Sequence, residues 1–101
     1  MKPVGLYMFV DSSVDSAVHK AEIETPKFTM LIQGVTSIEE GASIAGKLAE
    51  EGVSIIELCG GFGYGGAKAV SDAVGEKASV SMAVGQVLDA PKLAGILGDW
   101  T

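Results

Sequence analysis

Residues 53–66 have the sequence VSIIELCGGFGYGG. The first half, Val53–Cys59, is rich in β-branched residues and predicts a strand that is buried on at least one face. The second half, Gly60–Gly66, holds five glycines in seven residues and predicts a tight turn. Apolar residues then recur at helical spacing until Gly75. The stretch therefore predicts a strand–turn–helix unit, which is the building block of an α/β fold.

Two more strands are predicted before this unit. Continuous apolar runs over Val4–Val10 and Phe28–Gln33 favour buried strands. Between them, Val14–Lys20 predicts a short helix that a serine caps. Ala21–Thr25 predicts an irregular segment or an edge strand, because Pro26 breaks any helix.

A longer helix is predicted between the second and third strands. Ser37 and Glu40 have the spacing of a capping box, in which each side chain bonds to the backbone N–H of the other residue. Apolar residues follow at helical spacing, and Gly52 provides the stop. This helix has the most complete set of local signals in the chain.

The last part of the chain repeats the strand–helix order. Ala78–Val84 predicts a fourth strand, and the sequence Asp-Ala-Pro at 89–91 predicts the start of a last helix, with an N-cap and a first-turn proline. We expect the apolar residues of this helix to face the core: Leu93, Ala94, Ile96 and Leu97.

Successive strand–helix units with short connections predict right-handed crossovers and a mostly parallel sheet. We therefore expect a single α/β domain over residues 1–101, in which four strands form a two-layer or three-layer sandwich. The alternative is half of a TIM-like barrel that a second subunit completes.

The composition restricts the classes of partner. Acidic residues outnumber basic residues by 13 to 7, and the net charge of −6 disfavours binding to nucleic acid or to an anionic membrane surface. Hydrophobic residues form 48% of this short chain, so we expect a homo-oligomer to bury part of the apolar surface. A single cysteine, with no apolar run long enough for a signal peptide or a membrane span, favours a cytoplasmic protein.

The glycine-rich turn is the main candidate for a ligand site. Gly61, Gly63 and Gly66 match the G-x-G-x-x-G pattern of phosphate-binding turns, between a predicted strand and a predicted helix. A small anion, such as a phosphorylated metabolite, is one predicted ligand. The alternatives are a tight turn whose glycines serve packing and a contact with another protein. The candidate ligand-binding residues follow the first and third strands: Asp11, Gly60, Gly61, Phe62, Gly63, Tyr64, Gly65 and Gly66.

The sequence around the turn departs from that of a nucleotide-binding turn. The acidic ribose partner and the Walker lysine that accompany nucleotide-binding turns do not follow at the required positions, so the sequence identifies no cofactor. Phe62 is expected to pack in the core, whereas Tyr64 offers an aromatic face to a ligand or a subunit.

Three side chains near the turn are candidates for catalysis. Strand alternation places Glu57 on the same face as Cys59, where it would act as a general base or form a structural hydrogen bond or salt bridge. Cys59 would act as a nucleophile or pack as a small apolar residue. His19 would complete a dyad with Cys59 or lie exposed at the surface. No spaced cluster of histidines and cysteines predicts a metal site.

Two stretches resemble the signature of a small bacterial α/β family of unknown function. One is Glu50–Gly63, which contains the string IELCGGFG, and the other is His19–Pro26, where the family has the pattern H-[RK]-x-x-I-E-T-P. The similarity extends from about Val4 to Val84, and the segment Asp89–Thr101 departs from the family's ending. The string IELCGGF is also similar to a strand–loop of TIM-barrel copper-homeostasis proteins. The family resemblance assigns no activity, but it implies one recurring pattern that includes the glycine loop and four residues: His19, Glu24, Glu57 and Cys59.

Two hypotheses from different functional classes follow. In the first, the backbone amides of the glycine turn hold a small molecule, with Glu57 as base and Cys59 or His19 nearby. In the second, the chain is a non-enzymatic homo-oligomeric or partner-binding module, in which Trp100 and the turn at 62–64 are buried between chains.

Overall fold

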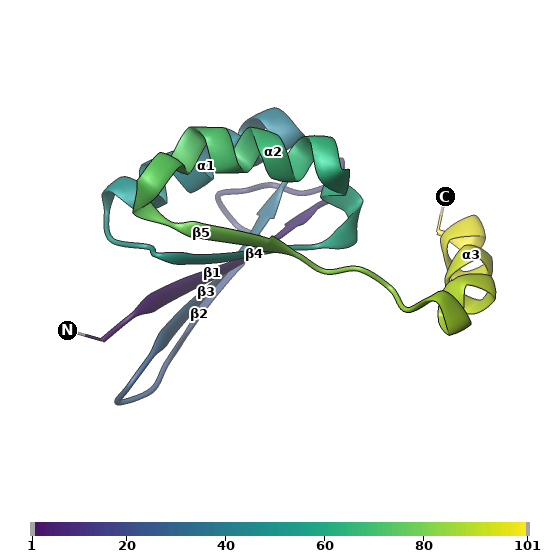
Figure 1. Cartoon of the computed structure of the whole chain (residues 1–101), viewed down its shortest axis with the longest axis horizontal. Coiled ribbons are helices and arrows are strands. Elements are labelled where there is room, and N and C mark those ends of the chain that lie inside the picture. The colour runs from purple at the N-terminus through teal and green to yellow at the C-terminus, as the bar shows by residue number, and fades with distance from the viewer. Residues whose placement is uncertain (1, 101) are drawn as a thin grey trace.

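In the computed structural model, which describes residues 2–100, the apolar run near the N-terminus forms β1 (Val4–Val10), the central strand of the sheet. β1 pairs in parallel with β3 (Thr29–Val35) on one side and with β4 (Ile55–Leu58) on the other. β5 (Ser79–Met82) pairs in parallel with β4. β2 (Lys20–Glu24) pairs antiparallel with β3, so the strand order is β2-β3-β1-β4-β5 (Figure 1).

The sheet is mostly parallel, as predicted, but the described residues form five strands rather than four. The extra strand is β2, from the segment for which the sequence allowed either an irregular conformation or an edge strand. β2 is fully exposed along its length and lies at the edge. The Thr25 hydroxyl accepts a hydrogen bond from the Phe28 N–H at 3.1 Å and stabilises the turn into β3. The sheet is open, and the half-barrel alternative is not confirmed.

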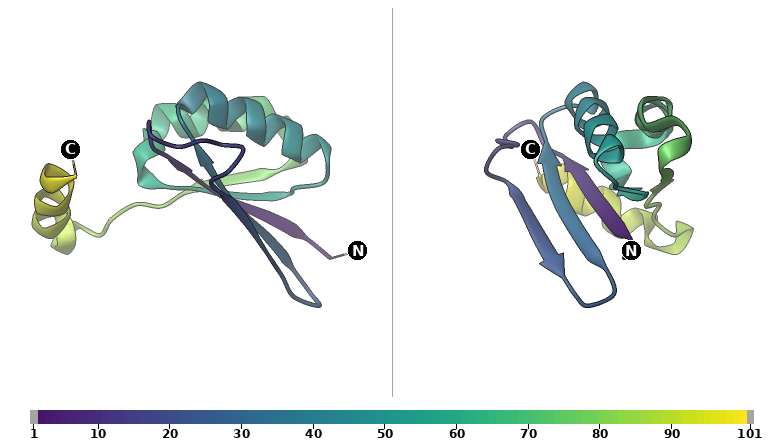
Figure 2. Two further views of the ribbon diagram at one scale, coloured as in Figure 1. Left: turned by 180° about the vertical axis from the view of Figure 1, so that it is seen from behind. Right: turned by 90° about the vertical axis from the view of Figure 1, so that its left-hand side faces the viewer.

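Two helices form the second layer. α1 (Ile38–Glu50) and α2 (Gly63–Val74) pack against each other on the same face of the sheet (Figures 1 and 2). The largest fully buried side chains come from β1, β3, β4 and α2: Leu6, Met8, Val35, Ile56, Leu58 and Val70. The core therefore lies between the sheet and this helix pair, and the opposite face of the sheet carries no helix from the described chain.

The start of α1 agrees with half of the predicted capping box. The Ser37 hydroxyl accepts a hydrogen bond from the Glu40 N–H at 3.1 Å. The Glu40 carboxylate does not return to Ser37, because it accepts from the Thr36 N–H at 2.7 Å and from the Ser16 hydroxyl at 3.0 Å. These bonds lower the pKa of Glu40, the Thr36 N–H having the largest effect. Glu40 thus connects the start of α1 to the loop that follows β1.

The short helix predicted over Val14–Lys20 is wrong. Residues 11–19 form turns, and Lys20 already belongs to β2. Polar side chains bind the backbone groups that a helix would need: the His19 Nδ1 accepts from the Asp15 N–H at 2.9 Å, and the Asp15 carboxylate accepts from the Ala17 N–H at 3.0 Å. Such local bonds favour turns over helix.

The predicted C-terminal helix exists, but its predicted orientation is wrong. β5 is followed by an extended linker at 83–86, a single 3-10 turn called η3 (Val87–Asp89), and α3 (Ala90–Asp99). Every residue of α3 is exposed, including Leu93, Ile96 and Leu97, because the linker carries the helix beyond the end of the sheet (Figure 1). No helix within residues 2–100 is long and apolar enough to cross a membrane.

Candidate functional site

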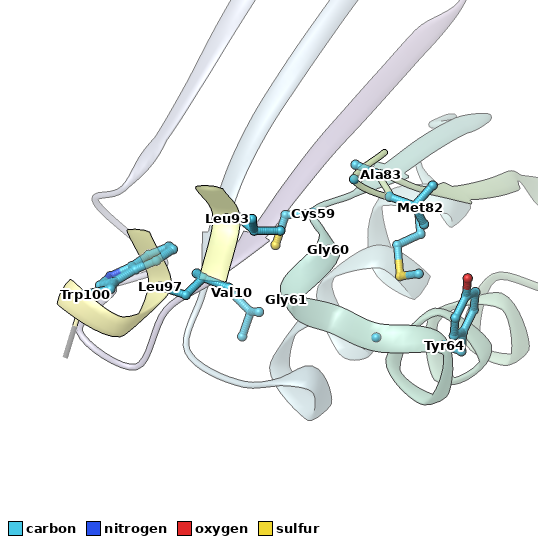
Figure 3. A pocket seen from close by; sticks show the side chains of 13 residues that line it. Val10, Cys59, Gly60, Gly61, Tyr64, Met82, Ala83, Leu93, Leu97 and Trp100 are labelled. Carbon is cyan, nitrogen blue, oxygen red and sulfur yellow. The ribbon is translucent and has the colours of Figure 1, made fainter. Parts of the chain in front are cut away.

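A pocket of about 720 Å³ lies where β1, β4 and β5 end. The ends of these strands and the glycine-rich turn form one side, and α3 forms the other (Figure 3). None of the described residues that line the pocket is an aspartate, glutamate, lysine, arginine or histidine. The lining residues are Val10, Cys59, Gly60, Gly61, Gly63, Tyr64, Met82, Ala83, Val84, Gly85, Leu93, Leu97 and Trp100.

Two of the glycines that line the pocket, Gly61 and Gly63, stand where a side chain would be strained or crowded. The turn begins with a 3-10 segment, η1 (Gly60–Phe62), and α2 starts directly at Gly63. Gly63 has φ +65°, a conformation that strains other L residues. A methyl group on Gly61 would lie 3.2 Å from Val10 Cγ1 and 3.4 Å from Cys59 Sγ. Glycine at these positions therefore permits the sharp passage from β4 to α2.

Two buried residues of the motif, Phe62 and Gly66, serve packing. Phe62 is 2% exposed and lies in the core, as predicted. A methyl group on Gly66 would lie 3.1 Å from both Ile38 Cδ1 and Phe62 Cβ, so the third glycine of the motif lets α2 approach α1 closely. Gly65 is exposed, and a methyl group on it would have no described atom within 4 Å. Phe62, Gly65 and Gly66 do not line the pocket.

The start of α2 offers hydrogen-bond donors near the pocket. The first amides of a helix have no intrahelical acceptor and carry the positive end of the helix dipole. Within residues 2–100, no side chain forms a capping hydrogen bond at this end of α2. Gly63 and Tyr64, the first two residues of the helix, both line the pocket, but the Gly63 N–H already donates to the Gly60 carbonyl oxygen. The Tyr64 N–H is therefore the helix-start donor at the pocket wall.

Cys59 is the only candidate catalytic residue in the pocket. Its N–H donates to the Met8 carbonyl oxygen at 3.0 Å, and its free thiol is partly buried. The Tyr64 side chain, 80% exposed, lies at the opposite side of the glycine turn from the Cys59 sulfur (Figure 3). Both residues line the pocket.

Glu57 does not line the pocket, although Cys59 does. It is exposed on the helix-free face of the sheet, in register with Tyr7 of β1. Cys59 follows the last residue of β4 with an extended backbone, and its N–H still bonds to β1 at the Met8 carbonyl oxygen. The pKa of Tyr7 is raised, first by burial and then by the nearby Cys59 and Glu57.

His19 and Asp11 also lie outside the pocket, in the loop between β1 and β2. Gly34 donates its N–H to the His19 carbonyl oxygen at 2.9 Å, which places His19 beside the end of β3. The Asp11 carboxylate accepts from the Ser13 N–H at 2.9 Å and from the Ser13 hydroxyl at 2.8 Å. These two bonds lower the pKa of Asp11, and His19 adds a smaller effect. The structure therefore does not bring His19 together with Cys59 in the pocket.

Sequence reasoning missed the apolar walls of the pocket. Val10 and Met82 lie at the ends of β1 and β5, and only the pairing of these strands with β4 brings the two residues together. Leu93, Leu97 and Trp100 come from the C-terminal helical segment, which was expected to enter the core. Their i, i+4, i+7 spacing marks a shared helical face, but it does not say what that face contacts.

A family model described as "Family of unknown function (DUF6506)" matches residues 5–96. The chain belongs to this family. The DUF6506 match passes beyond Val84 and into α3, so the expectation that the chain departs from its family from Asp89 onward is wrong for residues 89–96. α3 is thus part of the DUF6506 domain. Neither a curated protein nor a solved structure matches the chain.

Proposed function

We propose that this protein binds a small, largely apolar organic molecule with one acidic or polar group in the pocket at the carboxyl edge of the sheet. The observation that supports this most is the combination of an apolar lining with the uncapped start of α2. The volume of about 720 Å³ falls within the range of about 300–1,000 Å³ for small-molecule sites. Ligands of parallel sheets also gather at this edge.

The two ends of the ligand would meet different surroundings. Val10, Met82 and Leu97 offer apolar contacts to its body. The Tyr64 amide at the start of α2 would bind its acidic or polar group, since helix N-termini favour negative charge. A carboxylate suits this site better than a phosphate dianion, because the described lining supplies no lysine or arginine and the chain carries a net charge of −6. A phosphorylated metabolite stays a prediction from the sequence.

The position of the candidate catalytic residues supports binding rather than catalysis. An adjacent base within hydrogen-bond reach is one common activator of a nucleophilic cysteine. Cys59 lines the pocket, whereas His19 and Glu57 lie elsewhere on the surface. Cys59 would then contact the ligand as a small apolar group.

Titration with the fluorescent aromatic sulfonate 8-anilinonaphthalene-1-sulfonate tests this proposal, because the probe combines an apolar ring system with one anion. Ala83 is exposed and lines the pocket, so Ala83→Trp would fill the cavity at little cost to the fold. Ala17→Trp, at an exposed position in the loop after β1, is the matched control. We expect saturable binding that Ala83→Trp weakens at least tenfold and Ala17→Trp leaves unchanged. Equal binding by all three proteins would contradict the proposed site.

A further inference from the structure

The helix-free face of the sheet is the first of two large apolar surfaces that this chain leaves uncovered. Four of the five strands are parallel, and parallel sheets normally have both faces covered. We call this surface the open face. Ile23 on β2 and Ile55 on β4 are 58% and 45% exposed there. Other side chains on or over this face are only partly buried: Tyr7, Phe9, Phe28, Met30 and Ile32.

The second surface is the segment Val87–Trp100, formed by η3 and α3, which we call the projecting segment. Leu93 and Leu97 face the pocket of their own chain. Val87, Leu88 and Ile96 lie outside that pocket and are 87%, 85% and 63% exposed. A helix of ten residues is marginal in water without packing partners, so α3 needs a surface to cover this outer side.

The dimensions of the chain indicate how much surface is uncovered. The accessible surface is 6595 Å², compared with about 5,400 Å² for a folded monomer of 10.3 kDa. The excess of about 1,200 Å² is larger than the roughly 800 Å² that each partner buries in a standard protein–protein interface. The radius of gyration of 14.1 Å also exceeds the roughly 13 Å of a compact domain of this length.

We infer that a second copy of this chain covers both surfaces: the projecting segment of each copy packs on the open face of the other. A second copy is the occupant that these observations favour, because both complementary surfaces belong to one chain and a two-fold axis satisfies both at once. Pairing through the β2 edge is disfavoured, since Lys20, Glu22 and Glu24 place charges along that exposed strand.

The arrangement of polar residues agrees with this interface. On the open face, Glu57, Ser79 and Ser81 lie toward the β5 edge, where they would form a polar rim. The apolar residues gather over β1, β3 and β2, where the outer side of the projecting segment would lie. The inference does not depend on the proposed ligand, because the interface uses the outer side of α3 and the pocket is lined by the other side.

Sedimentation velocity at micromolar concentration tests the inference with three exposed positions. Ile23→Glu puts a charge on the open face, and Leu88→Glu puts one on the projecting segment. Ser71→Glu, on the exposed side of α2, is the control. We expect wild type and the control to sediment at twice the chain mass of 10.3 kDa and the other two variants to sediment as monomers with unchanged circular dichroism.

A mixture of the two monomeric variants makes the test specific. An Ile23→Glu chain keeps an unaltered projecting segment, and a Leu88→Glu chain keeps an unaltered open face. One unaltered segment can therefore pack on one unaltered open face in a mixed dimer. We expect mixing to restore part of the dimer population. A monomeric wild type would overturn the inference, and so would a dimer that both substitutions leave intact. Failure of the mixture to dimerise would overturn the segment-to-face arrangement.

Discussion

The two faces of the sheet differ sharply in packing, although both are built from apolar residues. Ile56 and its neighbour Ile55 are successive residues of β4 with the same side chain, yet they are 1% and 45% exposed. Ile56 points at α1 and α2, and Ile55 points at the open face. The difference shows that one face supplies the stability of the isolated chain, while the other remains available for an interaction between chains.

The pair of isoleucines measures this difference directly. In dilute solution we expect Ile56→Ala to lower the free energy of unfolding by about 2–5 kcal/mol, because it leaves a cavity in the core. We expect Ile55→Ala to cost less than about 1 kcal/mol, since its side chain is already half exposed. Urea unfolding of both variants checks this. Equal losses would contradict the distinction between the faces.

Two glycines extend the comparison to the helices. A methyl group on Gly41 of α1 would lie 2.9 Å from Phe62 Cε2, so Gly41→Ala should cost about 1–3 kcal/mol through overpacking. Gly95 of α3 has nothing within 4 Å of that position, so Gly95→Ala should instead stabilise the helix by about 0.5–1 kcal/mol. Thermal unfolding measures the first effect, and hydrogen exchange of the α3 amides measures the second. A neutral Gly41→Ala would show that α1 and Phe62 are loosely packed.

A smaller effect concerns pH. The lowered pKa of Glu40 means that its hydrogen bonds add stability above its ordinary value of 4.5, and that this stability is lost as pH falls through the lower pKa of the folded state. We expect Glu40→Gln to lower the melting temperature at neutral pH and to make the acid side of the stability profile less steep. A parallel profile for both proteins, measured by thermal unfolding across the acid range, would exclude this role for Glu40.

The elements that pack against the core are those whose signals are local. The start of α1 follows from Ser37, and the end of α2 at Val74 follows from Gly75, which has φ +58°. β2 and β3 form a hairpin through the turn at 25–28, but the sequence left β2 open because its exposed residues carry no buried apolar pattern. The orientation of α3 is not local, since an apolar stripe predicts a helix without saying which surface covers it.

The candidate site, like the fold, was predictable where its signals are local. The glycine-rich turn follows β4 as predicted, and five of its candidate residues line the pocket: Cys59, Gly60, Gly61, Gly63 and Tyr64. Of the three candidate catalytic residues, only Cys59 lines the pocket. Glu57 lies on the open face of β4, and local hydrogen bonds hold His19 in the loop beside β3.

A tryptophan on the outer side of the projecting segment gives the most direct test that a second copy covers it. Ile96 lies outside the pocket of its own chain and is 63% exposed, whereas Trp100, the single tryptophan of the chain, lines that pocket. In the double variant Ile96→Trp, Trp100→Phe, the account predicts that the emission is blue-shifted at high protein concentration and moves to the red on dilution, with the same midpoint as dimer dissociation measured by sedimentation. Emission typical of an exposed indole at every concentration would contradict it.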